Sequence, residues 1–461
     1  MIDHRRRTPA PRPAQPPVPA APAAAVDAPA AVDTAPAVAA PAGGLLALRL
    51  ATAVAQRATD GAVLQRLRLT RLDTTLGGTT ATTNWGRLAA SVAAYDQAVL
   101  DGRSIIVRTE LLDAAERLLR AGKALDTGFL GARHRDSRRT KRAAGQRLLL
   151  EINAERAALT AERAAAVAKF DAIGPEIWRQ YIDLRRQHHG SAVFDQGLHG
   201  KPPEPGYLAS MRSAHRLARD GLGERMTAQS YAEIQAASRA HSDDDAMAGW
   251  SSSTDRVNAD RSTAGVDFEA QVRNAWATSA TAPEAWEKVQ ALGLPMGDTF
   301  KLTTHPLTIN FEFKYEGKSE EASRARIQKL FDDFYATLRT TGTPLREIAR
   351  LHKNLEYMHA FKDANTRTNL VVLNKLLVEC GYNPVVLDDP NQSYTQTIDE
   401  WEALLDRGVR RWRAIRRAPA LGLTTEEMLQ AFDAHEGTPA RNALQAPAAN
   451  AASLAGLDFT T

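Results

Sequence analysis

The sequence predicts a mainly α-helical protein: a helical bundle with one β-hairpin, preceded by a helical N-terminal region and a disordered Pro/Ala-rich tail. Three observations carry this prediction. Apolar residues recur at helical spacing over most of the chain, apolar and polar residues alternate in one region near residues 299–314, and Pro and Ala fill most of the first 43 residues. The single hairpin therefore falls within an otherwise helical C-terminal unit.

Composition limits the classes of protein that fit. The chain has 461 residues, enough for roughly two to four domains. Lys and Arg number 58 against 54 acidic residues, a net charge of +4 that does not favour nucleic acid as a partner. A single cysteine excludes a disulfide framework. No apolar run approaches the length of about 18 residues that a membrane-spanning helix needs, so we expect no membrane span.

The N-terminal part divides into three segments by composition. Residues 1–43 offer little to bury, and we expect a disordered tail. Residues 44–190 read as helical and include a possible long helical hairpin. Within them, residues 142–170 carry an apolar stripe made of Leu148, Ile152, Leu159, Ala166 and Phe170. Residues 191–265 are poor in large apolar groups and are expected to be linker-like.

Residues 266–437 form the predicted C-terminal domain, and residues 438–461 a flexible tail. Alternation at Phe300, Leu302 and then Leu307 to Phe313 predicts the hairpin. Helices follow. They are indicated by an apolar stripe from Ile327 to Leu338, by Thr343-Pro344 at a helix start, by an apolar run over residues 368–380 that stops at Gly381, and by capping boxes at Thr397/Glu400 and Thr424/Glu427.

The decapeptide H-A-F-K-D-A-N-T-R-T at residues 359–368 stands where one of these helices begins. A helix N-terminus presents free N–H groups and a positive dipole end, which favour phosphate oxygens. Asp363 offers a hard carboxylate ligand for Mg²⁺, and Arg367 and Asn365 offer donors for phosphate oxygens. His359 is suited to take a proton from an attacking hydroxyl. These groups together suit the transfer of a phosphorus-containing group to a hydroxyl.

This decapeptide resembles the signature of the Fic/Doc family, H-x-F-x-[DE]-[GA]-N-x-R. The resemblance implies a Fic-like helical domain in which His359 is the catalytic base and Asp363 binds Mg²⁺. It also implies that the loop and helix start, with Ala364, Asn365, Thr366 and Arg367, bind the phosphates of ATP or another nucleotide. Most members transfer AMP to Ser, Thr or Tyr of a target protein, which a hairpin upstream of the motif aligns by strand pairing. The hairpin near residues 299–314 is the candidate for that flap.

The chain departs from the AMP-transferring pattern at three positions. Ala360 replaces a common Pro, and Thr366 replaces the Gly or Lys of the phosphate loop. Leu370 stands where a second Arg usually binds the terminal phosphates, and an apolar side chain cannot do so. With Leu at this position, the motif is similar to that of the Doc branch, whose members are protein kinases.

Four functions therefore stay open. The first is a protein adenylyltransferase of the Fic type. The others are a Doc-like protein kinase, a degenerate Fic-fold binding module without catalysis, and a helical adaptor that binds no nucleotide. The Pro/Ala-rich tail resembles the export signals of type III secreted effectors. We therefore expect a bacterial effector or toxin, either secreted into a host cell or acting in the bacterial cytoplasm.

Overall fold

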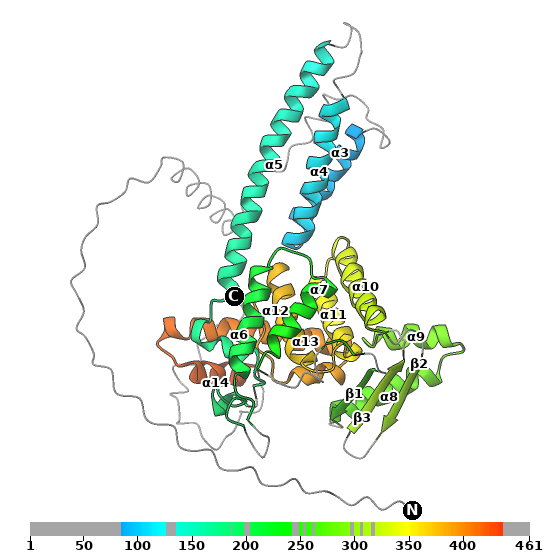
Figure 1. Cartoon of the computed structure of the whole chain (residues 1–461), viewed down its shortest axis with the longest axis vertical. Coiled ribbons are helices and arrows are strands. Elements are labelled where there is room, and N and C mark those ends of the chain that lie inside the picture. Colours follow the sequence, from blue (N-terminus) through cyan, green and yellow to red (C-terminus); the bar gives the residue numbers. More distant parts are fainter. Residues whose placement is uncertain are drawn as a thin grey trace, which may run out of the picture. The chain divides into compact units, whose positions relative to one another are not determined.

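The computed structural model describes residues 84–125, 135–184, 186–197, 203–241, 249–251, 255–260, 263–295, 299–304, 308–314 and 319–436. The tails predicted at 1–43 and 438–461 therefore lie outside the described residues. The described part of the chain is mainly helical and contains one antiparallel sheet (Figure 1), which confirms the predicted fold class. Within these ranges, no helix combines the length and the apolar character needed to span a lipid bilayer.

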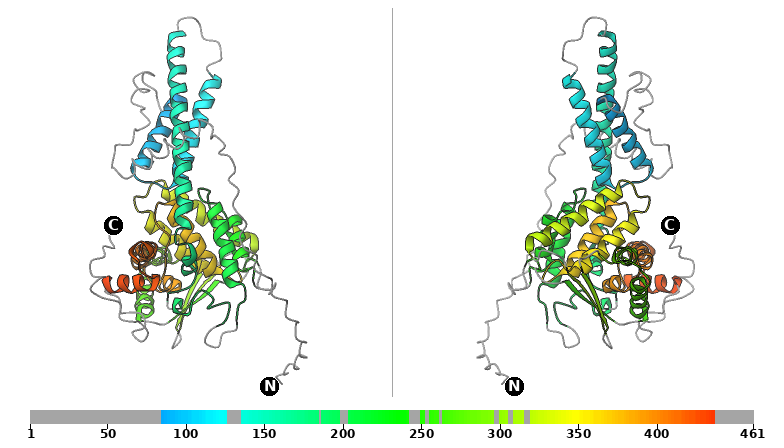
Figure 2. Two further views of the ribbon diagram at one scale, coloured as in Figure 1. Left: turned by 90° about the vertical axis from the view of Figure 1, so that its left-hand side faces the viewer. Right: turned by 90° about the vertical axis from the view of Figure 1, so that its right-hand side faces the viewer.

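Three helices form the N-terminal part: α3 (Asn84–Leu100), α4 (Ile105–Leu125) and α5 (Arg135–Phe170). The predicted apolar stripe lies on α5 and is buried throughout: Leu148, Ile152, Leu159, Ala166 and Phe170. Ion pairs join Arg108 of α4 to Glu162 of α5, and Asp113 to Arg156. From the first ion pair to the second, the residue number rises on α4 and falls on α5. The two helices are therefore antiparallel, in the manner of a helical hairpin (Figures 1 and 2).

The segment at residues 191–265 is not linker-like, and that prediction was wrong. It contains two packed helices and a strand: α6 (Tyr207–Asp220), α7 (Ala228–Ser238) and β1 (Asp255–Asp260). Met211 of α6 and Tyr231 of α7 are completely buried. A helix needs only a few large side chains at helical spacing to anchor one face. Low overall apolar content therefore misled the prediction.

The sheet has three antiparallel strands in the order β1-β3-β2, where β2 is Thr299–Thr304 and β3 is Thr308–Lys314. β2 and β3 form the predicted hairpin, with Leu302 opposite Phe311. β1 pairs along the other side of β3, with Val257 opposite the same Phe311. The sequence did not indicate β1, because Asp255–Asp260 contains only Val257 and Ala259 as apolar residues and shows no long alternation.

Two helices pack against the sheet: α8 (Thr263–Ala277) and α9 (Ala282–Ala291). Phe311 and Phe313 of β3 are fully buried in one cluster with Phe268 of α8 and Val289 of α9. The same cluster contains Tyr357, which lies two residues before the motif. The sheet is thereby tied to the end of the helix that leads into the motif.

The C-terminal helices follow the sheet in the sequence. They are α10 (Glu320–Leu338), α11 (Pro344–Met358), α12 (Asn365–Glu379), α13 (Ile398–Arg417) and α14 (Thr425–His435). Short 3-10 segments lie at Gly174–Gln180, Gln187–His189, Pro390–Tyr394 and Pro419–Leu421. Both predicted capping boxes form, at Thr397/Glu400 and Thr424/Glu427. α12 is buried along almost its whole length and contacts α5, α6, α7 and α11. Its N-terminus carries the motif.

Candidate anion-binding site at the start of α12

The motif loop, residues 359–364, joins α11 to α12. The residues at its two ends have a left-handed backbone conformation, with φ of 43° at His359 and 64° at Ala364. No other non-glycine residue in the described ranges has a positive φ. This conformation costs an L-residue about 1–2 kcal/mol, so it persists only where the surroundings impose it. Backbone strain in the described chain is thus concentrated at the two ends of the motif loop.

Contacts within the loop and with its neighbours hold it in place. The buried Asn365 side chain accepts a hydrogen bond from Phe361 N (2.9 Å) and donates one to Phe361 O (2.7 Å). The Phe361 ring is buried 4.9 Å from the ring of Tyr231 and 4.6 Å from that of Trp250. Asn365 therefore holds the loop in place through both the oxygen and the nitrogen of its side-chain amide. Its predicted role toward phosphate stays a prediction.

The N-terminus of α12 is not closed by a side chain. Ala364 occupies the N-cap position and makes no side-chain cap, so the first-turn N–H groups are available to an anion. The Thr366 hydroxyl instead donates to Glu356 Oε2 (3.1 Å), which also accepts from the Tyr394 hydroxyl (2.7 Å). Glu356 is fully buried, and burial raises its pKa to about 7 although these hydrogen bonds oppose the rise.

His359 ends α11 and is half-buried. Burial lowers its pKa below the usual value, an effect that the Glu356 carbonyl and the Asp363 carboxylate oppose. A lowered pKa keeps the imidazole neutral near pH 7, which is the form that can accept a proton. The position and ionisation of His359 are therefore compatible with a general base.

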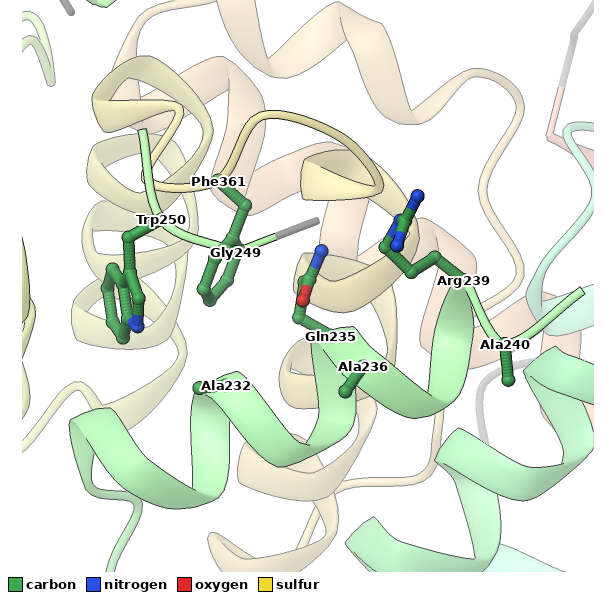
Figure 3. A pocket seen from close by; sticks show the side chains of 8 residues that line it. All are labelled: Ala232, Gln235, Ala236, Arg239, Ala240, Gly249, Trp250 and Phe361. Atoms are coloured by element: carbon green, nitrogen blue, oxygen red, sulfur yellow. The ribbon is translucent and has the colours of Figure 1, made fainter. Parts of the chain in front are cut away.

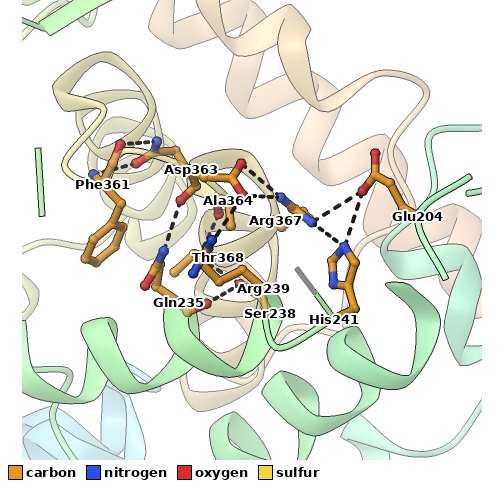
Figure 4. A network of polar contacts seen from close by, with 11 residues as sticks. Glu204, Gln235, Ser238, Arg239, His241, Phe361, Asp363, Ala364, Arg367 and Thr368 are labelled. Carbon is orange, nitrogen blue, oxygen red and sulfur yellow. Dashed lines mark hydrogen bonds and ion pairs between the residues drawn. The ribbon is translucent and has the colours of Figure 1, made fainter. Parts of the chain in front are cut away.

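Asp363 lies between two arginines (Figure 4). Arg367 Nη2 lies 3.0 Å from each carboxylate oxygen of Asp363, and Arg239 Nε, from the end of α7, lies 3.7 Å from Oδ2. Gln235 of α7 donates to the Asp363 main-chain carbonyl (3.1 Å). The structure thus brings the predicted metal ligand and the predicted phosphate-binding arginine into direct contact, and adds a second guanidinium to them.

The other side of Arg367 faces residues from before α6 and after α7. Its Nη1 lies 3.3 Å from His241 Nε2 and 3.7 Å from Glu204 Oε2. The guanidinium also lies over the ring of Tyr207, 5.6 Å from the centroid. These contacts orient Arg367 at the mouth of α12 (Figure 4).

Sequence reasoning missed Glu204, Gln235, Arg239 and His241, because all four come from the segment that was expected to be linker-like. The one available signal was Thr227 followed by Ser230, which forms a capping box at the start of α7. That signal predicts a helix but not which helix it packs against. The polar residues of α7 reach the motif through tertiary packing, which spacing along the chain does not reveal.

Two further observations bear on the predicted ligands. Leu370 is only 4% exposed and belongs to the core cluster, so it does not reach the anion site. The described residues contain no group of three or more His, Cys, Asp or Glu side chains that could hold a metal ion. Asp363, whose side chain is 32% exposed, offers a single carboxylate. That donor set fits Mg²⁺, which is commonly held by one or two carboxylates together with phosphates and water.

A cavity of about 280 Å³ opens beside the motif loop. Figure 3 shows Phe361 and Trp250 near one end and Arg239 near the other, with alanines of α7 between them. Ser251 N donates to Ala360 O (2.8 Å) and Lys362 N to Gly249 O (3.2 Å), so residues 249–251 run antiparallel to the motif loop along this edge. The cavity is mainly apolar and is bordered by one buried guanidinium.

A helical domain with an uncapped helix N-terminus, a neighbouring histidine and an Asp–Arg pair defines a class of protein suited to bind phosphate groups. Residues 310–377 match the model of the Fic/DOC family, a segment that begins in β3 and includes the whole motif loop. Over these residues the chain is similar to the Fic/DOC family. No curated protein matches the chain.

Proposed function

We propose that the protein is a Fic-type transferase that moves AMP, or another nucleotide-derived phosphate group, from a magnesium-bound nucleotide to a hydroxyl of a target protein. The observation that supports it best is the grouping of His359, Asp363 and Arg367 around the uncapped N-terminus of α12, inside the segment that matches the family model. Each of these groups has a part in moving a phosphorus-containing group.

With ATP as the donor, the target hydroxyl oxygen forms a bond to the α-phosphorus. The bond from that phosphorus to its bridging oxygen breaks, and pyrophosphate leaves. Neutral His359 takes the hydroxyl proton, while Arg367 and the first N–H groups of α12 hold phosphate oxygens. Asp363 would hold Mg²⁺, which when bound adds positive charge beside the phosphates. Binding of such a ligand would replace the Asp363–Arg367 contact by carboxylate–metal and guanidinium–phosphate contacts.

A Doc-like kinase is the second candidate, and the burial of Leu370 favours it. Without a second motif arginine, the triphosphate could bind in the opposite direction. The target hydroxyl would then attack the γ-phosphorus and release ADP. The same His359 would take the proton in both reactions, so the bond that breaks distinguishes the two.

We further propose that the protein acts as a bacterial effector or toxin, exported to a host cell or retained in the bacterial cytoplasm. The support is its Pro/Ala-rich N-terminal composition together with the segment that is similar to the Fic/DOC family. The expected partners are a nucleotide and a target protein that bears a Ser, Thr or Tyr hydroxyl.

Labelling tests both candidates. The full-length protein is incubated with Mg²⁺ and a host-cell or bacterial lysate, with ATP labelled on the α- or the γ-phosphate. His359→Ala serves as the inactive variant, and His188→Ala, which removes an exposed histidine, as the matched control. AMP transfer predicts α-label on protein that is lost in His359→Ala and kept in His188→Ala.

The other outcomes are equally distinct. Label from the γ-phosphate alone, again lost in His359→Ala, would establish the kinase reaction. Label that persists in His359→Ala would contradict a base role for that residue. Absence of both labels would reject ATP as the donor, and the non-catalytic binding module would then be the better interpretation.

A further inference from the structure

α7 is fixed against the motif by polar side chains at helical spacing. Because residues 231, 235 and 238 share one face of this helix, it cannot slide or rotate without breaking several contacts at once. The contacts are Tyr231 OH to Asn369 Oδ1 (2.6 Å), Gln235 Nε2 to Asp363 O (3.1 Å) and Ser238 Oγ to Thr368 Oγ1 (3.2 Å). These contacts therefore also fix the position of the residue that comes next in the chain.

That next residue is Arg239, the C-cap of α7. It is 7% exposed, and its Nε lies 3.7 Å from Asp363 Oδ2. It also borders the cavity beside Phe361 (Figure 3). Arg239 and Arg367 thus approach one carboxylate from two elements that lie far apart in the sequence.

We propose that Arg239 binds the phosphate chain of the ligand together with Arg367, so that the site prefers a ligand with two or more phosphate groups to a monophosphate. This inference rests on the proposed function. Leu370, at the motif position where a second arginine is usual, is buried in the core, and Arg239 brings a guanidinium to the site from α7 instead. A guanidinium suits this task because its rigid fork of donors matches phosphate oxygens.

The charges around Asp363 support the same ligand. When a divalent cation takes the Asp363 carboxylate, both guanidinium groups exchange that contact for phosphate oxygens. A chain of phosphates carries enough negative charge for two arginines and a cation, whereas a single phosphate does not. The buried position of Arg239 strengthens its interaction with such an anion, since little water screens it.

Binding to the full-length protein provides the test, because it does not depend on catalysis. Isothermal titration calorimetry with Mg²⁺ would compare ATP and AMP as probes in the wild type, Arg239→Ala and Arg239→Lys. Arg324→Ala is the matched control: Arg324 lies over the ring of Trp250, a residue of the same cavity, but pairs with Glu320. Each variant is first checked for folding by its thermal unfolding transition.

The expected result is a rise in the Kd for ATP of about 10- to 100-fold in Arg239→Ala, the loss expected for a charge-assisted hydrogen bond. Arg239→Lys should recover part of it, and the Kd for AMP should change much less. Unchanged ATP binding, or an equal loss for ATP and AMP, would overturn the inference and leave the proposed function standing. If the wild type binds neither nucleotide, the result contradicts both this inference and the proposed function with ATP as the donor. Should Arg239→Ala fail to fold, Arg239→Gln, which keeps side-chain donors but no charge, takes its place.

Discussion

Arg367 Nη2 lies 3.0 Å from both carboxylate oxygens of Asp363, the residue four positions earlier in the sequence. The residue expected to hold a cation and the residue expected to hold an anion therefore form an ion pair with each other. A magnesium-bound phosphate can separate this pair without leaving either charge uncompensated, because the cation takes the carboxylate and the phosphate takes the guanidinium. The pair is thus suited to exchange partners when such a ligand binds.

Replacing Asp363 by Asn should abolish this exchange while keeping the size of the side chain. We expect transfer to fall by roughly 100-fold or more, because the neutral amide is a poor Mg²⁺ ligand and loses the charge stabilisation that the cation supplies. The measurement is the rate of label transfer as a function of Mg²⁺ concentration. Asp333→Asn, which removes an exposed carboxylate paired with Lys329, is the control. A wild-type rate in Asp363→Asn would show that this carboxylate does not bind the catalytic cation.

Replacing Asn365 by Ala should destabilise the motif loop. The variant loses two buried hydrogen bonds and leaves the N–H and carbonyl of Phe361 without these partners. We expect a loss of about 2–4 kcal/mol in the free energy of unfolding. Urea denaturation measures it, with Asn274→Ala at an exposed position of α8 as the control. If both variants lose equally little, the amide does not brace the loop in solution.

The left-handed conformation of Ala364 predicts opposite effects for two substitutions. Ala364→Gly removes the clash of Cβ at φ 64° and should stabilise the protein by up to about 1 kcal/mol. Ala364→Val introduces a β-branched side chain at the same φ and should cost at least about 2 kcal/mol. Denaturation curves compare both with Ala434→Val at an exposed position of α14, where about 0.5 kcal/mol is expected. Equal costs for the two valine variants would mean that residue 364 is not held left-handed.

Local sequence signals were sufficient for the elements that they specify directly. Capping boxes at Thr397 and Thr424 and alternation along β3 each depend on residues within one turn or one strand, and the elements they predicted are present. The motif loop could also be located, because its residues are consecutive in the sequence. These features need no knowledge of what lies across the core.

The parts of the fold and of the site that could not be predicted depend on contacts between residues far apart in the sequence. Arg239 reaches Asp363 across 124 positions of sequence (363 − 239), and Tyr231 reaches Asn369 in the same way. Spacing rules describe residues on one helix, so they give no information about which face of another helix a side chain meets. The bracing role of Asn365 was missed for a different reason: the same amide suits a phosphate and a main chain equally well, and only the geometry of the loop decides between them.

The lowered pKa of His359 predicts the pH dependence of transfer. A general base works in its neutral form, so the rate should rise with pH, pass its midpoint below pH 6.5 and be level above it, since burial holds the pKa of His359 below the usual 6.5. A rate profile between pH 4.5 and 8.5 in the labelling assay measures this. The midpoint should persist in Glu356→Gln, which removes the other group near the loop with a pKa close to neutrality. A midpoint above 6.5 would contradict the lowered pKa of His359.

Glu356, beneath the start of α12, predicts a pH-dependent stability. Burial raises its pKa from 4.5 to about 7. Because the folded pKa exceeds the unfolded one, its contribution is complete below about pH 4.5 and is lost as the pH rises to about 7. Glu356→Gln keeps an oxygen that can accept from Thr366 and Tyr394 but carries no charge. We therefore expect the variant to gain stability relative to the wild type between pH 4.5 and pH 8, by up to about 3 kcal/mol.

The measurement is the free energy of unfolding in urea at both pH values for the wild type, Glu356→Gln and Glu321→Gln, an exposed glutamate of α10. Burial lowers the pKa of the neighbouring Lys353 to about 7, which acts in the opposite direction on the wild type. Lys353 is present in all three proteins, so the difference between variant and wild type at each pH isolates Glu356. If that difference is the same at pH 4.5 and pH 8, folding does not shift the pKa of Glu356, and the Thr366 hydroxyl then contacts a carboxylate at neutral pH.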